Sequence, residues 1–70
     1  MSKHEIAGAI QKRRESLTLK QEDLAEMAGI TPKTIYLLET GKGNPSLQTM
    51  QKVLNVLGME ISINIKTMNK

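Results

Sequence analysis

The chain of 70 residues contains no cysteine, no tryptophan, no phenylalanine and one aromatic residue, Tyr36. Without cysteine, no disulfide can stabilise the fold. His4 is the only histidine, and structural zinc sites draw on Cys and His together, so we expect an exposed His4 and no metal. The chain also lacks the roughly 18 consecutive apolar residues of a membrane-spanning helix and the apolar run of a signal peptide. We therefore expect a cytoplasmic protein without cofactor or membrane contact.

Hydrophobic residues make up 39% of the chain, and the core must be built from Ile, Leu, Val, Ala and Met. A chain of this length is expected to form a single domain. Domains below roughly 70 to 80 residues seldom obtain more than about 3 to 5 kcal/mol from one core. Because disulfides and zinc are excluded, we expect stabilisation by oligomerisation. The net charge of +3, with basic residues concentrated in residues 1–20, permits nucleic-acid binding but does not prove it.

Apolar residues recur at helical spacing in four segments of the chain. We expect helices at about Glu5–Ser16, Gln21–Ala28, Pro32–Thr40 and Ser46–Leu57. Gly29 fits the position after a helix C-terminus, and Thr31 followed by Pro32 fits a helix start. The buried side of the last helix is predicted to carry Leu47, Met50, Val53, Leu54 and Leu57.

The segment after Gly58 has a different sequence pattern, in which apolar and polar residues alternate. The apolar residues are Met59, Ile61, Ile63 and Ile65. A period of two predicts a half-buried β-strand over residues 59–66. One strand cannot satisfy its own backbone groups. We expect it to pair antiparallel with the same segment of a second copy; the alternative is a segment that becomes ordered on a different protein. The predicted fold is thus all-α with one C-terminal β-strand, residues 1–58 forming the helical domain and residues 59–70 the dimerisation strand and tail.

The second and third predicted helices, joined by a short turn containing Gly29, have the lengths of a helix-turn-helix. In that motif the second helix enters the major groove of DNA, and the start of the first helix meets the phosphate backbone. Gln21 lies at that start, where free N–H groups and the helix dipole favour a phosphate oxygen. Lys20 adds positive charge there. Double-stranded DNA is therefore the expected partner.

The patterns L-K-Q-x-x-L-A at 19–25, A-G-I-T at 28–31 and T-I-Y-x-L-E-x-G at 34–41 resemble the Cro/CI-type, or XRE, helix-turn-helix family over residues 5–58. The resemblance implies a four-helix, lambda-repressor-like DNA-binding domain. The run from Glu39 to Leu47, followed by the C-terminal strand, further resembles the HipB-like branch of antitoxins and autorepressors. That likeness implies a homodimer and a HipA-like serine/threonine kinase as a toxin partner. The alternatives are a stand-alone XRE-family repressor or the antitoxin of another toxin class.

The expected DNA contacts lie mainly on the third helix and the loop after it. Lys33 is suited to donate to guanine O6 or N7, Thr34 to reach a base edge or a thymine methyl, and Tyr36 to contact a methyl or a phosphate. The whole expected set is Lys20, Gln21, Thr31, Lys33, Thr34, Tyr36, Leu37, Lys42 and Asn44. Leu37 is expected at a thymine methyl, and the family likeness places Gln21, Lys42 and Asn44 at phosphates. The alternatives are solvated surface for Lys33 and Lys42, and shielding of the core by Tyr36.

Several positions depart from the family pattern or serve the fold. Thr18 stands where the family usually has a glycine, so we expect a strained or differently shaped turn there. Lys20 replaces the family's frequent Ser or Thr cap. The family likeness implies an ion pair between Arg14 and Glu39, which we interpret as structural.

No group of residues fits a catalytic site. Glu22, Asp23 and Glu26 lie on one short helix, and no serine has a histidine plausibly beside it. The segment Gly41–Gly43 lacks the context and length of a phosphate-binding loop. The protein is therefore not expected to be an enzyme. A dimeric repressor would bind an inverted repeat with half-sites about 10 bp apart, centre to centre.

Overall fold

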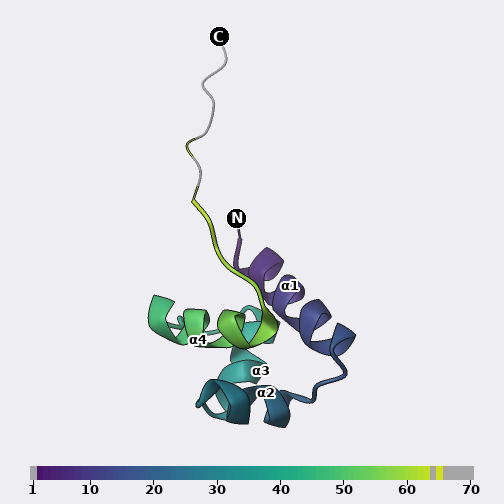
Figure 1. Cartoon of the computed structure of the whole chain (residues 1–70). Helices are drawn as coiled ribbons and strands as arrows, with labels where there is room; N and C mark the ends of the chain where they lie inside the picture. Colours follow the sequence, from purple (N-terminus) through teal and green to yellow (C-terminus); the bar gives the residue numbers. More distant parts are fainter. Residues whose placement is uncertain (1, 64, 66–70) are drawn as a thin grey trace.

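The structure, a computed structural model, describes residues 2–63 and 65. Its helices are α1 (Lys3–Ser16), α2 (Gln21–Ala28), α3 (Pro32–Thr40) and α4 (Leu47–Leu57). α1 and α2 both pack against α3 and α4, so the four helices enclose one core (Figure 1). The bounds of α2 and α3 agree with the prediction. In the part of the chain that is described, none of the helices has the length and apolar character needed to cross a membrane.

The starts of α1 and α4 differ from the prediction because of their capping residues. α1 begins two residues earlier, at Lys3, since Ser2 and Glu5 form a capping box. The Glu5 N–H donates to Ser2 Oγ at 3.1 Å, and the Ser2 N–H donates to Glu5 Oε1 at 3.0 Å. Such a box satisfies two backbone donors that a helix start leaves free. α4 begins at Leu47, one residue later than predicted, because Ser46 is its N-cap and its Oγ accepts from the Thr49 N–H at 3.0 Å.

The turn between α1 and α2 contains the strained residue expected from the sequence. Thr18 has a φ of +56°, which makes it the one described residue other than glycine with a positive φ. Its hydroxyl donates to the Leu17 carbonyl at 2.6 Å. An L-residue in this left-handed region brings its Cβ close to the following carbonyl oxygen. The turn that leads into α2 is therefore built at a steric cost.

The core is aliphatic and draws on all four helices. Its buried residues are Ile10, Leu24, Ala25, Ile35, Leu38, Val53, Leu54 and Leu57. One prediction for α4 is wrong: Leu47 is 64% exposed. Leu47 is the first residue of α4, and its side chain lines a surface groove together with Met59, Ile61 and Ile63. Leu47 follows the helical spacing of the apolar residues in α4, but it lies neither in the buried core nor among the partly buried residues that pack against it.

The segment after α4 leaves the helical body (Figure 1). Gly58 ends the helix with a φ of +68°, and the Met59 N–H donates to the Leu54 carbonyl at 2.9 Å. Residues 59–63 and 65 form no strand, while residues 64 and 66–70 lie outside the described residues. The predicted strand over residues 59–66 is therefore not found in its described part, and the described residues offer it no second strand. Ile63 and Ile65 are 95% and 98% exposed.

Candidate nucleic-acid interface

The turn between α2 and α3 fixes the direction of α3. Gly29 ends α2 in the left-handed conformation with a φ of +72°, and the Ile30 N–H returns to the Ala25 carbonyl at 2.9 Å. Thr31 is the N-cap of α3, where its Oγ1 accepts from the Thr34 N–H at 3.2 Å. Pro32 occupies the first helical position, which needs no N–H donor. The local sequence thus produces a helix, a tight turn and a second helix.

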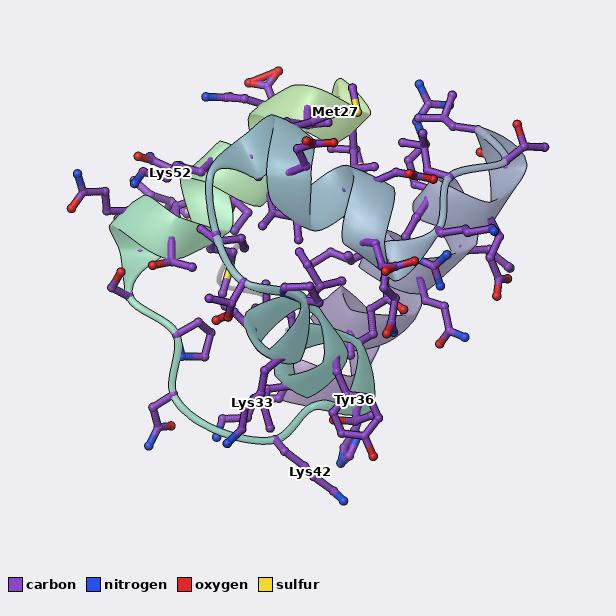
Figure 2. All side chains as sticks on the ribbon, turned by 90° about the horizontal axis from the view of Figure 1, so that it is seen from below. Met27, Lys33, Tyr36, Lys42 and Lys52 are labelled. Carbon is purple, nitrogen blue, oxygen red and sulfur yellow. The ribbon has the colours of Figure 1, made fainter. Side chains whose placement is uncertain are left out.

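The outward face of α3 and the following loop form a basic surface, which we define as Lys33, Tyr36 and Lys42. Figure 2 shows these three side chains on one side of the domain, while Met27 and Lys52 lie on the opposite side. Tyr36 is 48% exposed. Between residues 32 and 46 the only acidic residue is Glu39, and it is buried. No exposed carboxylate of this segment therefore opposes the approach of a phosphate.

Three other predicted contact residues have partners within the domain. Thr31 Oγ1 and Thr34 Oγ1 lie 2.9 Å apart and share a hydrogen bond in the cap of α3. Leu37 is half-buried, and its Cδ1 would lie 3.8 Å from a Cβ placed on Gly43. Leu37 therefore packs beside the loop after α3.

The ion pair between Arg14 and Glu39 is present and buried. Arg14 Nε donates to Glu39 Oε2 at 2.6 Å and Nη2 donates to Oε1 at 3.0 Å, with side-chain exposures of 11% and 2%. Arg14 Nη1 also donates to the Leu19 carbonyl at 2.6 Å. The hydrogen bond to Glu39 raises the pKa of Arg14, so the guanidinium stays charged. These contacts tie α1 to the end of α3 and to the chain entering α2.

The residues expected at phosphates lie in two places. Lys20 is exposed at the start of α2, where its backbone N–H donates to Asp23 Oδ2 at 2.9 Å. Gln21 follows it, half-buried, and its Nε2 donates to Glu39 Oε1 at 3.1 Å. The Gln21 amide is therefore held by the same carboxylate that binds Arg14. Lys42 is exposed on the loop after α3.

Asn44, in the same loop, has a partner that the sequence did not indicate. Its Oδ1 accepts from Lys3 Nζ at 3.0 Å, and the Gly43 carbonyl accepts from the same ammonium at 2.9 Å. Lys3 lies 41 residues before Asn44, and no local pattern signals a contact over that separation. Lys3 is thus a residue of this surface that sequence reasoning missed.

The described residues offer no cluster of metal-ligating side chains. In residues 2–63 and 65, no three His, Cys, Asp or Glu side chains stand where they would hold a metal ion. His4 is exposed at the start of α1, and its ring lies over Gly41. The arrangement thus offers donor groups and positive charge on one face of the domain (Figure 2), which is the chemistry of recognition of an anionic polymer.

Comparison with known proteins defines the class of this domain. A family model described as "Helix-turn-helix" (HTH_3) matches residues 10–64. The chain is 43% identical over 51 residues to a protein of Methanothermobacter thermautotrophicus named as an uncharacterized HTH-type transcriptional regulator, covering 73% of this chain and 74% of that protein. It is 37% identical over 49 residues to the HTH-type transcriptional regulator PuuR of Escherichia coli, covering 70% of this chain and 26% of PuuR.

Solved structures give the same fold. The clp gene regulator ClgR from Corynebacterium glutamicum superposes with a TM-score of 0.75 at 23% identity, over 81% of this chain and 61% of that chain. Apo-HppE superposes with a TM-score of 0.73 at 28% identity, over 84% of this chain and 33% of that chain. The chain belongs to the XRE-type helix-turn-helix family. This is a family of DNA-binding regulators and not of enzymes, so the protein is not an enzyme, as the sequence predicted.

Proposed function

We propose that the protein is a sequence-specific DNA-binding transcriptional repressor in which α3 reads the major groove. The basic surface of Lys33, Tyr36 and Lys42 is the observation that carries this proposal (Figure 2). It lies on the second helix of the motif and the loop after it, where the helix-turn-helix geometry requires base and phosphate contacts. Relatives that align with 51 and 49 residues of this chain are named HTH-type transcriptional regulators.

The proposed contacts divide into base readout and backbone positioning. Lys33, near the N-terminus of α3, is proposed to donate to a guanine, and Tyr36 to pack on a thymine methyl or bind a phosphate. Thr31 and Thr34 reach the groove from the cap of α3. Leu37 is proposed to touch a thymine methyl at the edge of this face. The proposed phosphate contacts are Lys20, Gln21, Lys42 and Asn44, which flank α3 on the start of α2 and on the following loop.

The repressor is proposed to act as a homodimer closed by residues 59–66. Ile61, Ile63 and Ile65 are exposed in the single chain, and this row of apolar side chains favours pairing with another chain. A groove lined by Leu47, Leu54, Met59 and Ile61 lies beside the segment. The same segment of a second copy supplies both a strand partner and apolar contacts, because two-fold symmetry repeats each contact. A two-fold dimer in turn requires an inverted-repeat operator.

Selection of bound duplexes from a random-sequence DNA library tests the proposal directly. An inverted repeat with half-sites about one helical turn apart is the expected product. Lys33→Ala should relax the preference at one position of each half-site by about 1 to 3 kcal/mol. Lys42→Ala should weaken all sequences alike and lower the salt slope by about 1. Lys52→Ala removes the same charge from the opposite side of the domain and should change neither. Enrichment of no sequence, or equal effects of all three variants, would contradict the proposal.

A second candidate is an antitoxin that also represses its own operon. The likeness of residues 39–47 to the HipB branch supports it, as does an exposed apolar segment that suits a partner protein as well as a second copy. The partner would be a HipA-like serine/threonine kinase. Nuclease-treated pull-down of the tagged chain from its native cells separates the candidates. Stoichiometric recovery of a kinase establishes the antitoxin, a toxin of another class points to a different module, and recovery of only its own dimer leaves a stand-alone repressor.

A further inference from the structure

Two residues in the first turn of α1, Lys3 and His4, contact the loop that follows α3. Lys3 Nζ donates to the Gly43 carbonyl at 2.9 Å and to Asn44 Oδ1 at 3.0 Å. His4, the next residue, lies over Gly41, where an added Cβ would be 3.1 Å from the imidazole Nδ1. The capping box of Ser2 and Glu5 fixes the helix start that carries both side chains. Two consecutive residues of α1 thus contact the loop of residues 41–45.

The backbone of this loop has few other restraints. Gly41 and Gly43, on either side of Lys42, have φ values of +71° and +76°. The Lys42 N–H donates to the Leu37 carbonyl at 3.0 Å, whereas among the described residues neither Gly43 nor Asn44 donates a backbone–backbone hydrogen bond. The loop also lies beside a hollow of about 160 Å³ that Lys3, Leu38 and Met50 help to line. Core packing therefore does not fill the space beside the loop, and among the described residues the Lys3 ammonium makes the hydrogen bonds that join the loop to α1.

We propose that Lys3 is a positioning residue, which holds the loop of residues 41–45 in the conformation that presents Lys42 to a DNA phosphate. This inference rests on the proposed DNA-binding function. Ordering a flexible loop on binding costs conformational entropy, and a loop that is already ordered avoids that cost. In this arrangement Lys3 acts through the loop and makes no base contact.

A double-mutant cycle between Lys3 and Lys42 tests the proposal. Lys3→Met keeps most of the aliphatic stem and removes the ammonium donor. On the DNA recovered by the selection above, it should weaken binding about threefold to tenfold, the size expected for lost hydrogen bonds at an exposed site. Lys42→Met should then weaken binding far less in the Lys3→Met background than in the wild type. Lys52→Met, which removes the same charge from the opposite side of the domain (Figure 2), is the matched control and should change affinity by less than about twofold.

Two outcomes of the cycle overturn the proposal. Additive losses from Lys3→Met and Lys42→Met mean that Lys3 makes its own phosphate contact and does not act through the loop. A Lys3→Met effect equal to that of Lys52→Met means that only overall charge matters. Thermal unfolding of each variant accompanies the cycle, because a folded Lys3→Met protein is required for either comparison.

The free protein provides a readout that does not depend on DNA. Lys3→Met should shift the backbone amide NMR signals of Lys42, Gly43 and Asn44, while the signals of α2 stay in place. It should also speed the hydrogen exchange of the Lys42 N–H, which donates to the Leu37 carbonyl. Unchanged amide signals of the loop would refute the proposal that Lys3 holds the loop. If the wild-type protein binds no DNA, the proposed function fails and the role at a phosphate fails with it. The amide measurement then still decides whether Lys3 holds the loop.

Discussion

Replacement of Arg14 by methionine should remove most of the stability of the domain. Glu39 is 2% exposed at its side chain and receives two hydrogen bonds from Arg14, at 2.6 and 3.0 Å. Arg14→Met leaves that carboxylate buried with only the Gln21 amide, which donates at 3.1 Å. Breaking one side of a buried pair costs about 3 to 5 kcal/mol. A core of this size supplies about the same amount, so the variant should be largely unfolded at 25 °C.

Urea unfolding followed by circular dichroism, at one fixed protein concentration, measures the effect. The double variant Arg14→Met/Glu39→Met is the decisive control, because replacing both partners removes the uncompensated charge. It should recover to within about 1 kcal/mol of the wild type or exceed it. A loss below about 1 kcal/mol for Arg14→Met alone, as for a surface ion pair, would refute the reasoning. If Arg14→Met is unfolded as expected, its loss of DNA binding reports unfolding and not a lost contact with DNA.

Three further perturbations follow from the backbone and the first helix turn. Thr18→Gly should raise the free energy of unfolding by about 1 kcal/mol, because relief of about 1 to 2 kcal/mol of left-handed strain outweighs the added entropy of the unfolded chain. Thr18→Ala keeps the Cβ and should give no gain in stability. Equal melting temperatures for the two variants would contradict the account. Gly41→Ala should lower the free energy of unfolding, measured with urea, by at least about 1 kcal/mol. The reason is that φ is +71° and the new Cβ would lie 3.1 Å from His4 Nδ1. An unchanged free energy of unfolding would be evidence against that contact. The hydrogen bonds from the Ser2 N–H and hydroxyl lower the pKa of Glu5, so its stabilising effect is present above its ordinary pKa and is lost as pH falls through the lowered value. The melting-temperature difference between wild type and Glu5→Gln should therefore shrink as pH falls below the ordinary glutamate pKa of about 4.3 and disappear below the lowered pKa. A difference independent of pH would argue against the cap.

Local sequence signals predicted the helix-turn-helix closely. Gly29, Thr31 and Pro32 each act on the residues next to them, and α2 and α3 have the predicted bounds. The start of α1 was predicted two residues late, although Ser2 and Glu5 stand at capping-box spacing. Periodicity also placed Leu47 in the core, where the structure leaves it exposed. Spacing alone gives the direction of a side chain but not how far the neighbouring helices extend.

The site was harder to predict, because side-chain partners from distant segments decide what each polar group can do. Gln21 was expected at a phosphate, yet its amide donates to Glu39, 18 residues away. Asn44 likewise accepts from Lys3 at the start of α1. The C-terminal strand is harder still to predict, because its hydrogen-bond partner would lie in another chain. The alternating pattern predicts an apolar face made of Ile61, Ile63 and Ile65 that is buried in an interface. It does not predict which chain packs against that face.

The salt dependence of DNA binding tests the central claim most directly. Fluorescence anisotropy of the wild-type protein on the selected inverted repeat, between 50 and 200 mM salt, should show affinity falling by about 10³ to 10⁵ for about 6 to 10 phosphate contacts. A scrambled duplex of the same length should bind more weakly at every salt concentration. Steep salt dependence together with preference for the repeat is the result that the account predicts. A flat response, or equal binding of both duplexes, would contradict sequence-specific DNA recognition by α3.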